Sequence, residues 1–402
     1  MRTRTLVADG EPDKPIAIVA AGDGDVIIDC AGADVGFNIM AADYLYFEGL
    51  TIRDARIAFH GGFQGVIGCK GLTVKRCQFE QVQYGVLAQD GRSTDFYIAD
   101  NVILGRNPAD RFNPESGGAW GRTKAGYAVN LAGQGHVVCF NRCENFWDVL
   151  NVFTNCLADP AFGQQARAID FYNNDLYNVT DNFIETDGGY ANIRVLRNRC
   201  FNGMVAPLSV QPVYAGPVYW IRNVLYNAHK GARAFKLEAI VNDNVICYHN
   251  TLTNHWTNSG GLHFGDIRNN LFMGPADYVT ERDRQRGRNV LDIGFQDSSG
   301  ILDHNAHRVG LPVEKPFVFN GRAFASLAAL AAATGREQNG LEIRDYDEVF
   351  AATEEPEHAP NNEGRLYRPH EVDLRLRADA PVVDAACRLP GINDDFTGKA
   401  PD

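Results

Sequence analysis

Several features are missing from this sequence, and each absence excludes a class of protein. The nine Cys residues form no CxxC pair, so the spacing typical of a zinc site is absent. No apolar run approaches the ~20 residues of a membrane-spanning helix, and we expect no membrane partner. Methionine is scarce, at 4 residues against 40 glycines, which favours short strands and turns over long helices.

Positive charge is also in short supply. The formal net charge is -12, whereas binding to a nucleic-acid backbone needs clustered Lys and Arg, so no nucleic-acid partner is expected. An anionic sugar stays compatible with this charge, because a local basic patch can sit within a negative field. Hydrophobic residues make up 45% and charged residues 22%, which predicts a soluble folded chain.

What the sequence does contain is an internal repeat of asparagine pairs. The two members of a pair lie four residues apart, and the first members follow one another at intervals of 33, 24, 25 and 27 residues. Five pairs are consecutive: Asn141 and Asn145, Asn174 and Asn178, Asn198 and Asn202, Asn223 and Asn227, and Asn250 and Asn254. Asn101 and Asn270 look like further first members, with Gly105 and Gly274 in the second place.

Each first asparagine closes a short β-branched or aromatic stretch, as in Val-Tyr-Trp-Ile-Arg-Asn at 218–223. Asparagine suits a sharp turn, because it tolerates the left-handed conformation, and stacked asparagines can form a hydrogen-bonded ladder. A period near 25 with strands only excludes the βαβ solenoids and fits one coil of a parallel β-helix. A β-sandwich, the alternative, would not explain five consecutive pairs.

The repeat also predicts how the chain is organised. About ten coils run from about Pro15 to about Asn305, so we expect an all-β parallel β-helix over 1–309 and a C-terminal segment over 310–402 that packs on it. An insertion at 107–124 is rich in Gly, Pro and charge and reads as a surface loop. The Ala- and Leu-rich stretch at 324–334 predicts a short helix.

Several stretches resemble a known group. They are Gly216 to Asn227, Ala234 to Glu238, Tyr248 to Leu252, and the tail from Leu389 to Asp402. Together they are similar to right-handed parallel β-helix proteins of the pectate-lyase-like superfamily, of the secreted bacterial type. The resemblance implies the right-handed coil, a polysaccharide or oligosaccharide substrate, and an extracellular or periplasmic location. It does not select a reaction, because the superfamily includes lyases, hydrolases, epimerases and tail-spike depolymerases.

One departure from that group concerns the N-terminus. Such proteins usually begin with an export signal and a capping segment, and the first residues here resemble neither. An uncapped first coil would expose a strand edge. We therefore expect a missing N-terminal piece or a cap supplied by another chain, as in a homo-oligomer.

Aligning the coils on the second asparagine of each pair predicts one polar stripe on the outside of the solenoid. Alternation along each strand points the odd offsets outward. The densest part of the stripe holds Asp181, Glu185 and Asp187, with Asp148 expected to stack on Asp181 one coil away. At the offset of Asp187 we expect Gln211, Lys236 and His263 in the same column.

These acids favour glycoside hydrolysis, which needs one carboxyl group as acid and another as base or nucleophile. Coils ~4.8 Å apart and i, i+2 side chains ~6.6 Å apart give suitable separations, and crowding raises the pKa of one member. The same cluster could instead hold a structural Ca²⁺ or form a solvated acidic surface. Either no cofactor or Ca²⁺ is therefore expected.

Two other functions remain open from the sequence. A polysaccharide lyase would use Lys236 and His263, with Arg222 or a metal neutralising a uronate carboxylate. A non-catalytic β-helix would use the stripe only to bind glycan. Sugar rings stack on aromatic side chains, so the candidate platforms are Trp147, Tyr190, Trp256 and, in the insertion, Trp120, although each could equally be a packing residue.

Overall fold

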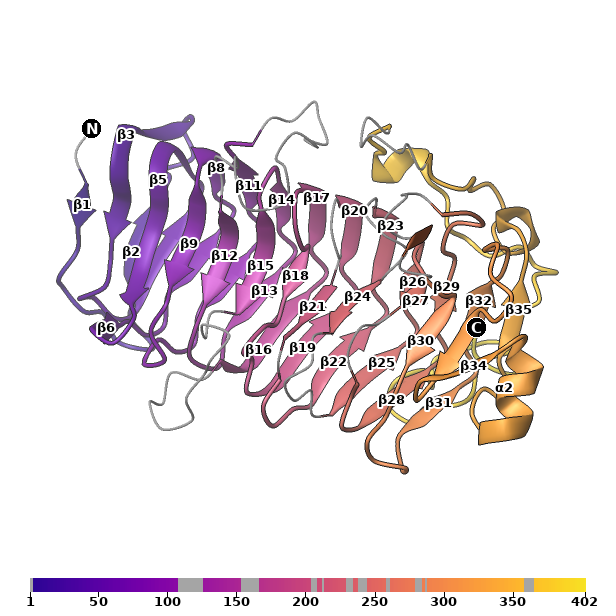
Figure 1. Cartoon of the computed structure of the whole chain (residues 1–402). Coiled ribbons are helices and arrows are strands. Elements are labelled where there is room, and N and C mark those ends of the chain that lie inside the picture. Colours follow the sequence, from indigo (N-terminus) through magenta and orange to yellow (C-terminus); the bar gives the residue numbers. More distant parts are fainter. Residues whose placement is uncertain are drawn as a thin grey trace.

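The computed structural model describes residues 3–107, 126–152, 166–203, 208–211, 213–228, 234–237, 244–257, 261–278, 284–285, 288–357 and 365–402. Within these residues the chain winds as a parallel β-helix, with strands of successive coils stacked side by side along one axis (Figure 1). The predicted fold class is confirmed. The insertion at 107–124 lies outside the described residues except for Asn107.

Three runs of parallel strands form the walls of the solenoid. The first is an 11-stranded sheet. Its strands are β2 (Ile16–Val19), β4 (Leu45–Glu48), β7 (Thr73–Lys75), β10 (Tyr97–Ala99), β13 (Val137–Cys139), β16 (Arg167–Tyr172), β19 (Ala191–Leu196), β22 (Val218–Ile221), β25 (Val245–Tyr248), β28 (Gly265–Arg268) and β31 (Ile301–Asp303).

The other two runs are joined in one 20-stranded sheet through two long N-terminal strands, β3 (Val26–Asn38) and β5 (Leu50–Phe63), and β5 pairs with the first member of each run. The second run is β8 (Gln78–Val82), β11 (Val102–Gly105), β14 (Arg142–Glu144), β17 (Asp175–Val179), β20 (Arg199–Gly203), β23 (Val224–Ala228), β26 (Thr251–Leu252), β29 (Leu271–Phe272), β32 (Ala306–Arg308) and β35 (Leu341–Ile343). The third run is β9 (Tyr84–Ala88), β12 (Tyr127–Leu131), β15 (Asp148–Val152), β18 (Ile184–Glu185), β21 (Leu208–Val210) and β24 (Phe235–Leu237).

Shorter elements complete the two ends. At the N-terminal end, β1 (Arg4–Thr5) pairs with β3 and β6 (Ile67–Gly68) pairs with β5. Near the C-terminal end, a four-stranded sheet contains β27 (Trp256–Thr257), β30 (Leu291–Ile293), β33 (Phe317–Phe319) and β34 (Arg322–Phe324). The predicted helix is present as α2 (Leu327–Thr334), with Ser326 as its N-cap and Gly335 as its left-handed C-cap.

The first asparagines of the pairs form the expected ladder inside the solenoid. Each Nδ2 donates to the Oδ1 of the next coil at 2.9–3.1 Å, from Asn101 through Asn141, Asn174, Asn198, Asn223, Asn250 and Asn270 to Asn305. Each side chain also donates to a main-chain oxygen and accepts from a main-chain N–H, as Asn198 does with Phe171 O and Asn174 N. The ladder ends at Glu337, whose carboxylate accepts from Asn305 at 2.9 Å.

The left-handed turn at these positions differs from the prediction. The residue before each first asparagine takes the positive φ, for example Arg197 at 55° and Arg222 at 56°. The first asparagine itself is free to point its amide inward along the ladder. Four of the five second asparagines, from Asn145 to Asn227, do adopt the left-handed conformation, as in Asn178 (56°) and Asn202 (65°), and these four form a second amide ladder.

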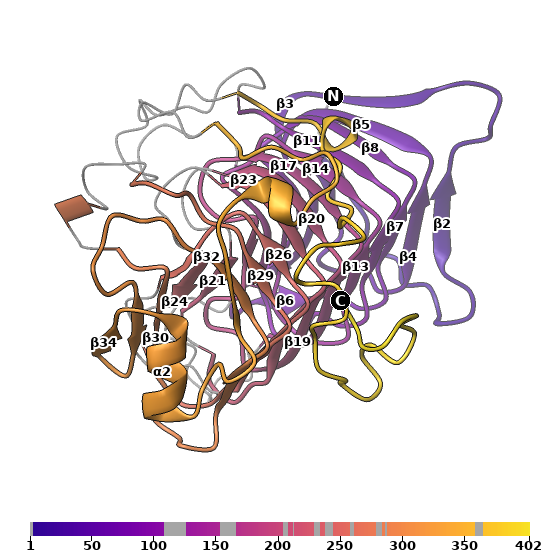
Figure 2. The same ribbon diagram turned by 90° about the vertical axis from the view of Figure 1, so that its right-hand side faces the viewer.

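The C-terminal segment packs against the outside of the later coils. Tyr367 packs on Tyr226 with ring centroids 5.1 Å apart and donates its main-chain N–H to Asn202 at 2.9 Å. Two short 3₁₀ turns, η2 (Tyr346–Glu348) and η3 (Pro369–Glu371), lie in this segment, which is coloured orange to yellow beside the coils in Figure 2. The parallel ladder itself continues past Val309, because β32 pairs with β35.

No helix among the described residues is both long and apolar enough to cross a membrane.

Candidate functional site

A column of polar side chains runs along the outside of the third run of strands. The strand register aligns Asn151 with Glu185, Glu185 with Ser209, and Ser209 with Lys236 on four successive coils. The residue before each of these is an interior apolar side chain, and Leu150, Ile184, Leu208 and Phe235 are all buried in the core. Strand alternation therefore turns the column outward.

Glu185 and Asp187 are the central carboxyl groups of the site. Their side chains hydrogen-bond to each other. Asn151 Nδ2 donates to Glu185 Oε2 from the preceding coil, and Ser209 Oγ donates to Asp187 Oδ1 at 2.6 Å from the following coil. Both carboxyl groups are thus fixed by donors on regular strands, which hold them more rigidly than a loop would.

Two more acids lie beside this pair, where the chain turns into β15 and β18. Trp147 Nε1 donates to Asp181 Oδ2 at 3.0 Å, while Asp181 Oδ1 is buried and has no hydrogen-bond partner among the described residues. Asp148 Oδ1 accepts from the main-chain N–H (2.8 Å) and the amide (2.9 Å) of Asn182. Asp148 and Asp181 are both nearly buried, at 3% and 7% exposure.

The environment raises the pKa values of three of these acids, Asp148, Glu185 and Asp187. Burial, then the charge of Glu185 and of Asp181, raises the pKa of Asp148 well above its usual range. Burial, then the charge of Asp187 and its hydrogen bond, does the same to Glu185. Burial also raises the pKa of Asp187, but Lys236, Ser209 and Glu185 oppose it, and the pKa is about 6. Two neighbouring carboxyls with separated pKa values are suited to acid and base roles.

Lys236 supplies positive charge at the C-terminal end of the column. Burial alone would lower the pKa of its ammonium, but the charges of Asp187, Asp181, Glu185 and Asp148 outweigh this and raise it. Lys236 is therefore protonated at neutral pH and moderates the repulsion within the acid cluster.

Two of the predicted stackings are wrong. Asp148 stacks on Asn182, and Trp147, one residue earlier, is the neighbour of Asp181. Lys236 stacks on Ser209 and so shares a column with Glu185 rather than with Asp187 and Gln211. The cause is unequal coil length. The first interior residue of the outer strand lies at a different distance from the second asparagine in each coil. Leu150 is five positions after Asn145, Ile184 is six after Asn178, and Phe235 is eight after Asn227.

His263 does not join the column. The coil after Lys236 continues at β27, where Trp256 packs on Phe235 with ring centroids 4.4 Å apart, and His263 lies beyond that strand. It is exposed in the bend before β28, and its main-chain oxygen accepts from Asp297 N at 2.8 Å. The alignment that placed His263 beside Lys236 is wrong.

The predicted sugar-binding residues are dispersed. Trp256 is an interior residue at 1% exposure and offers no ring face to a ligand. Arg222 donates to Ile392 O at 2.9 Å and Asp395 Oδ1 at 3.0 Å, so it is held by the C-terminal segment. Half-buried Tyr190 lies directly before β19, and half-buried Gln211 lies in the bend after β21. Trp147 alone is brought into contact with an acid of the cluster. Trp120 lies outside the described residues.

The site also contains residues that the sequence did not single out. Asn151, Asn182 and Ser209 bind the carboxylates, and Tyr127 is aligned with Asp148 on the preceding coil. Ser209 stands at the same offset from its second asparagine as Glu185, so the repeat contained the signal for it. Asn151 lies one position closer to its second asparagine than Glu185 does, so the change in coil length hid it.

Within the described residues, no group of three or more His, Cys, Asp or Glu side chains is arranged to hold a metal ion. Comparison with known proteins adds no assignment, because no protein-family model, no characterised protein and no solved structure matches this chain. The parallel β-helix and the acid cluster are thus the two observations from which a function can be inferred.

Proposed function

We propose that this chain is a carbohydrate-active enzyme that hydrolyses glycosidic bonds, and that it belongs with the pectate-lyase-like right-handed β-helix proteins. The observation that carries the proposal is the hydrogen-bonded pair Glu185 and Asp187 on the outer face of the solenoid. Glycoside hydrolysis requires a carboxyl group that is still protonated at working pH beside one that is ionised. A solvated acidic surface would not produce such a pair, because exposed carboxyls keep ordinary pKa values.

Glu185 is the general acid in this mechanism. Its raised pKa keeps the proton available, and it is the less buried member of the pair. As the glycosidic bond breaks, the carboxyl proton passes to the leaving oxygen, and the conjugate base is stabilised by the donor Asn151.

Asp181 is the base that takes a proton from the attacking water. Trp147 fixes one of its oxygens, and the other, Oδ1, accepts no hydrogen bond from the part of the chain that the structure describes, which leaves it to accept one from the attacking water. Asp187 orients Glu185 through their shared hydrogen bond. Each step moves one proton between named oxygen atoms, and the water oxygen forms the new bond to the sugar.

A lyase mechanism fits the same residues less well. β-Elimination needs a neutral base beside the sugar, whereas the surrounding acids raise the pKa of Lys236 and keep it protonated. His263, the other base considered, lies outside the column. Lys236 could still neutralise a uronate carboxylate, so a lyase, with or without Ca²⁺, stays the second candidate, and an unsaturated product would distinguish it.

A panel of neutral and acidic polysaccharides tests the proposal. Hydrolysis releases reducing ends without ultraviolet absorbance, whereas elimination yields an unsaturated uronate that absorbs. New reducing ends that are abolished in Glu185→Gln but retained in the surface variant Asp170→Asn support hydrolysis. Unsaturated product, or glycan binding without any product, would overturn it.

A further inference from the structure

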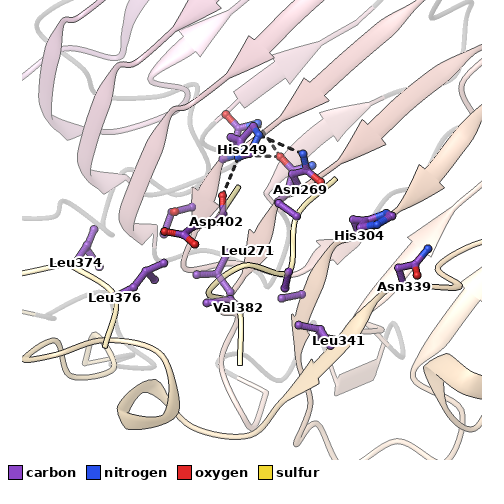
Figure 3. Close-up of a pocket in the computed structure, with 16 residues that line it drawn as sticks. His249, Asn269, Leu271, His304, Asn339, Leu341, Leu374, Leu376, Val382 and Asp402 are labelled. Carbon is purple, nitrogen blue, oxygen red and sulfur yellow. Dashed lines mark hydrogen bonds between the residues drawn. The ribbon is translucent and has the colours of Figure 1, made fainter. Parts of the chain in front are cut away.

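A second feature of the molecule lies away from the acid cluster, under the C-terminal segment. A cavity of about 150 Å³ separates this segment from the side of the coils (Figure 3). Leucine and valine side chains from the segment, Leu374, Leu376 and Val382, line one part of it, and His249 and Asn269 line another. His249 is the left-handed residue just before ladder residue Asn250, with φ 54°.

The orientation of two amides beside His249 is fixed by main-chain partners. Asn269 Oδ1 accepts from Cys387 N at 2.9 Å, and its Nδ2 donates to Cys387 O at 2.8 Å. Asn393 Oδ1 accepts from Leu389 N at 2.7 Å, and its Nδ2 donates to Cys387 O at 3.0 Å. Reversing either amide would face donor against donor, so both Nδ2 groups are assigned independently of the histidine.

Both of these Nδ2 groups also point at the same imidazole nitrogen. His249 Nε2 lies 3.1 Å from Asn269 Nδ2 and 2.8 Å from Asn393 Nδ2. His249 Nδ1 lies 3.0 Å from the main-chain oxygen of Asp402, which can only accept. Nε2 must therefore be an acceptor and Nδ1 must carry the hydrogen, which defines a neutral imidazole.

We infer that His249 is a pH-sensitive latch that holds the C-terminal segment on the solenoid only while the imidazole is neutral. Protonation places an N–H at Nε2 opposite two amide donors, so both hydrogen bonds are lost and like partial charges meet. Leu389 of the segment packs with Ile221 and Tyr248 of the coils in one buried apolar cluster. Opening the latch would therefore expose apolar side chains to water.

The charged groups around His249 set the direction of its response. Burial, then the charge of Arg222, lowers the pKa of His249 below its ordinary value, while Asp402 and Asp395 oppose this. Arg222 also binds the segment, because its guanidinium donates to Ile392 O. His304 lines the same cavity from two coils further along the solenoid. The latch is thus closed at neutral pH and opens as the pH falls below the lowered pKa.

Amide hydrogen exchange tests this inference directly. The N–H groups of Cys387, Leu389 and Asn393 are protected by bonds within the latch. Between about pH 7.5 and about pH 5, and after correction for intrinsic rates, we expect their protection to fall about tenfold or more. In His249→Gln the side-chain oxygen can still accept and the amide can still donate, but nothing titrates, so protection should no longer depend on pH.

His304→Gln is the matched control, because it removes a histidine from the same cavity and should keep the wild-type response. A response unchanged in His249→Gln, or absent in the wild type, would overturn the latch. Imidazole ¹⁵N shifts of the wild-type protein give a second test that needs no variant. A hydrogen on Nε2 of His249 at neutral pH, or a His249 titration midpoint that differs from that of segment opening, would refute the inference.

Discussion

The carboxyl groups of Glu185 and Asp187, two residues apart on one turn of the solenoid, share a hydrogen bond, and each also accepts a bond from a different neighbouring coil. Glu185 lies on β18 and Asp187 lies in the turn that follows it, and the stacked coils add a donor on each side of the pair. The acid pair is therefore a product of the solenoid itself.

Because Asp187 is buried, its ionised carboxylate lowers the stability of the folded protein at neutral pH. Its pKa is about 6 when folded against 3.8 for the free side chain, so the folded state binds more protons between these values. Stability should fall as the pH rises from about 4 to about 6 and then level off. Asp187→Asn should thus stabilise the protein by up to about 3 kcal/mol at pH 7 and by almost nothing at pH 4.

Urea unfolding at the two pH values measures this difference. Asp170→Asn, which alters a half-exposed surface pair with Arg194, serves as control and should change stability by less than about 0.5 kcal/mol at either pH. Equal destabilisation by Asp187→Asn at both pH values would show that burial does not penalise the charge.

Ser209→Ala tests the donor that opposes this penalty. The Ser209 hydroxyl lowers the pKa of Asp187 through its 2.6 Å bond, so its loss should raise that pKa by about one unit. The acidic limb of the kcat/KM profile should move to higher pH by a similar amount. Thr186→Val, which removes a hydroxyl bonded to Ser209 O from the interior side, should leave the limb in place.

Lys236→Met separates the two candidate reactions. For a hydrolase, Lys236 only lowers the pKa values of Glu185 and Asp187, so the variant should retain hydrolysis, and the basic limb set by the acid Glu185 should move to higher pH. For a lyase that needs Lys236 opposite a uronate, elimination should fall by about 10²–10³-fold. The readout is the pH–rate profile together with the ultraviolet absorbance of the product.

Asn198→Ala tests the interior ladder. Asn198 accepts from Asn174 and donates to Asn223 and to Phe171 O, all in the core, so its removal leaves several buried polar groups unpaired. We expect a loss of about 3–5 kcal/mol in urea unfolding. Asn192→Ala is the control, because Asn192 is exposed and lies outside the ladder but also has a positive φ, of 54°. This substitution should lower stability by only about 1 kcal/mol. Similar losses in the two variants would contradict the ladder's role.

The fold could be predicted from the sequence because the asparagine ladder repeats over eight successive coils, from Asn101 to Asn305, and tolerates little change. Asn174, Asn198 and Asn223 bond side chain to side chain, which requires the same residue at the same depth in each coil. The helix at 327–334 was likewise signalled by local composition, although the predicted stretch began at Phe324.

The site could be predicted only in part. The acids Asp181, Glu185 and Asp187 were found because they lie close together in sequence, and Glu185 and Ser209 share one offset from the repeat. The positions of Asp148, Lys236 and His263 relative to them were wrong, because outward turns absorb insertions of one or two residues without disturbing the ladder. For Trp256 the sequence left a sugar platform and a packing residue open, and the structure shows an interior packing residue.

The central claim is that Glu185 donates a proton during glycosidic hydrolysis. The most direct measurement is the kcat of Glu185→Gln on the best polysaccharide of the panel, with the fold checked by circular dichroism. Gln keeps the shape and the acceptor for Asn151 but carries no acidic proton, so we predict a fall in kcat of about 10²–10⁴-fold with little change in KM. A kcat within about twofold of the wild type would show that Glu185 is not the general acid and would contradict the account.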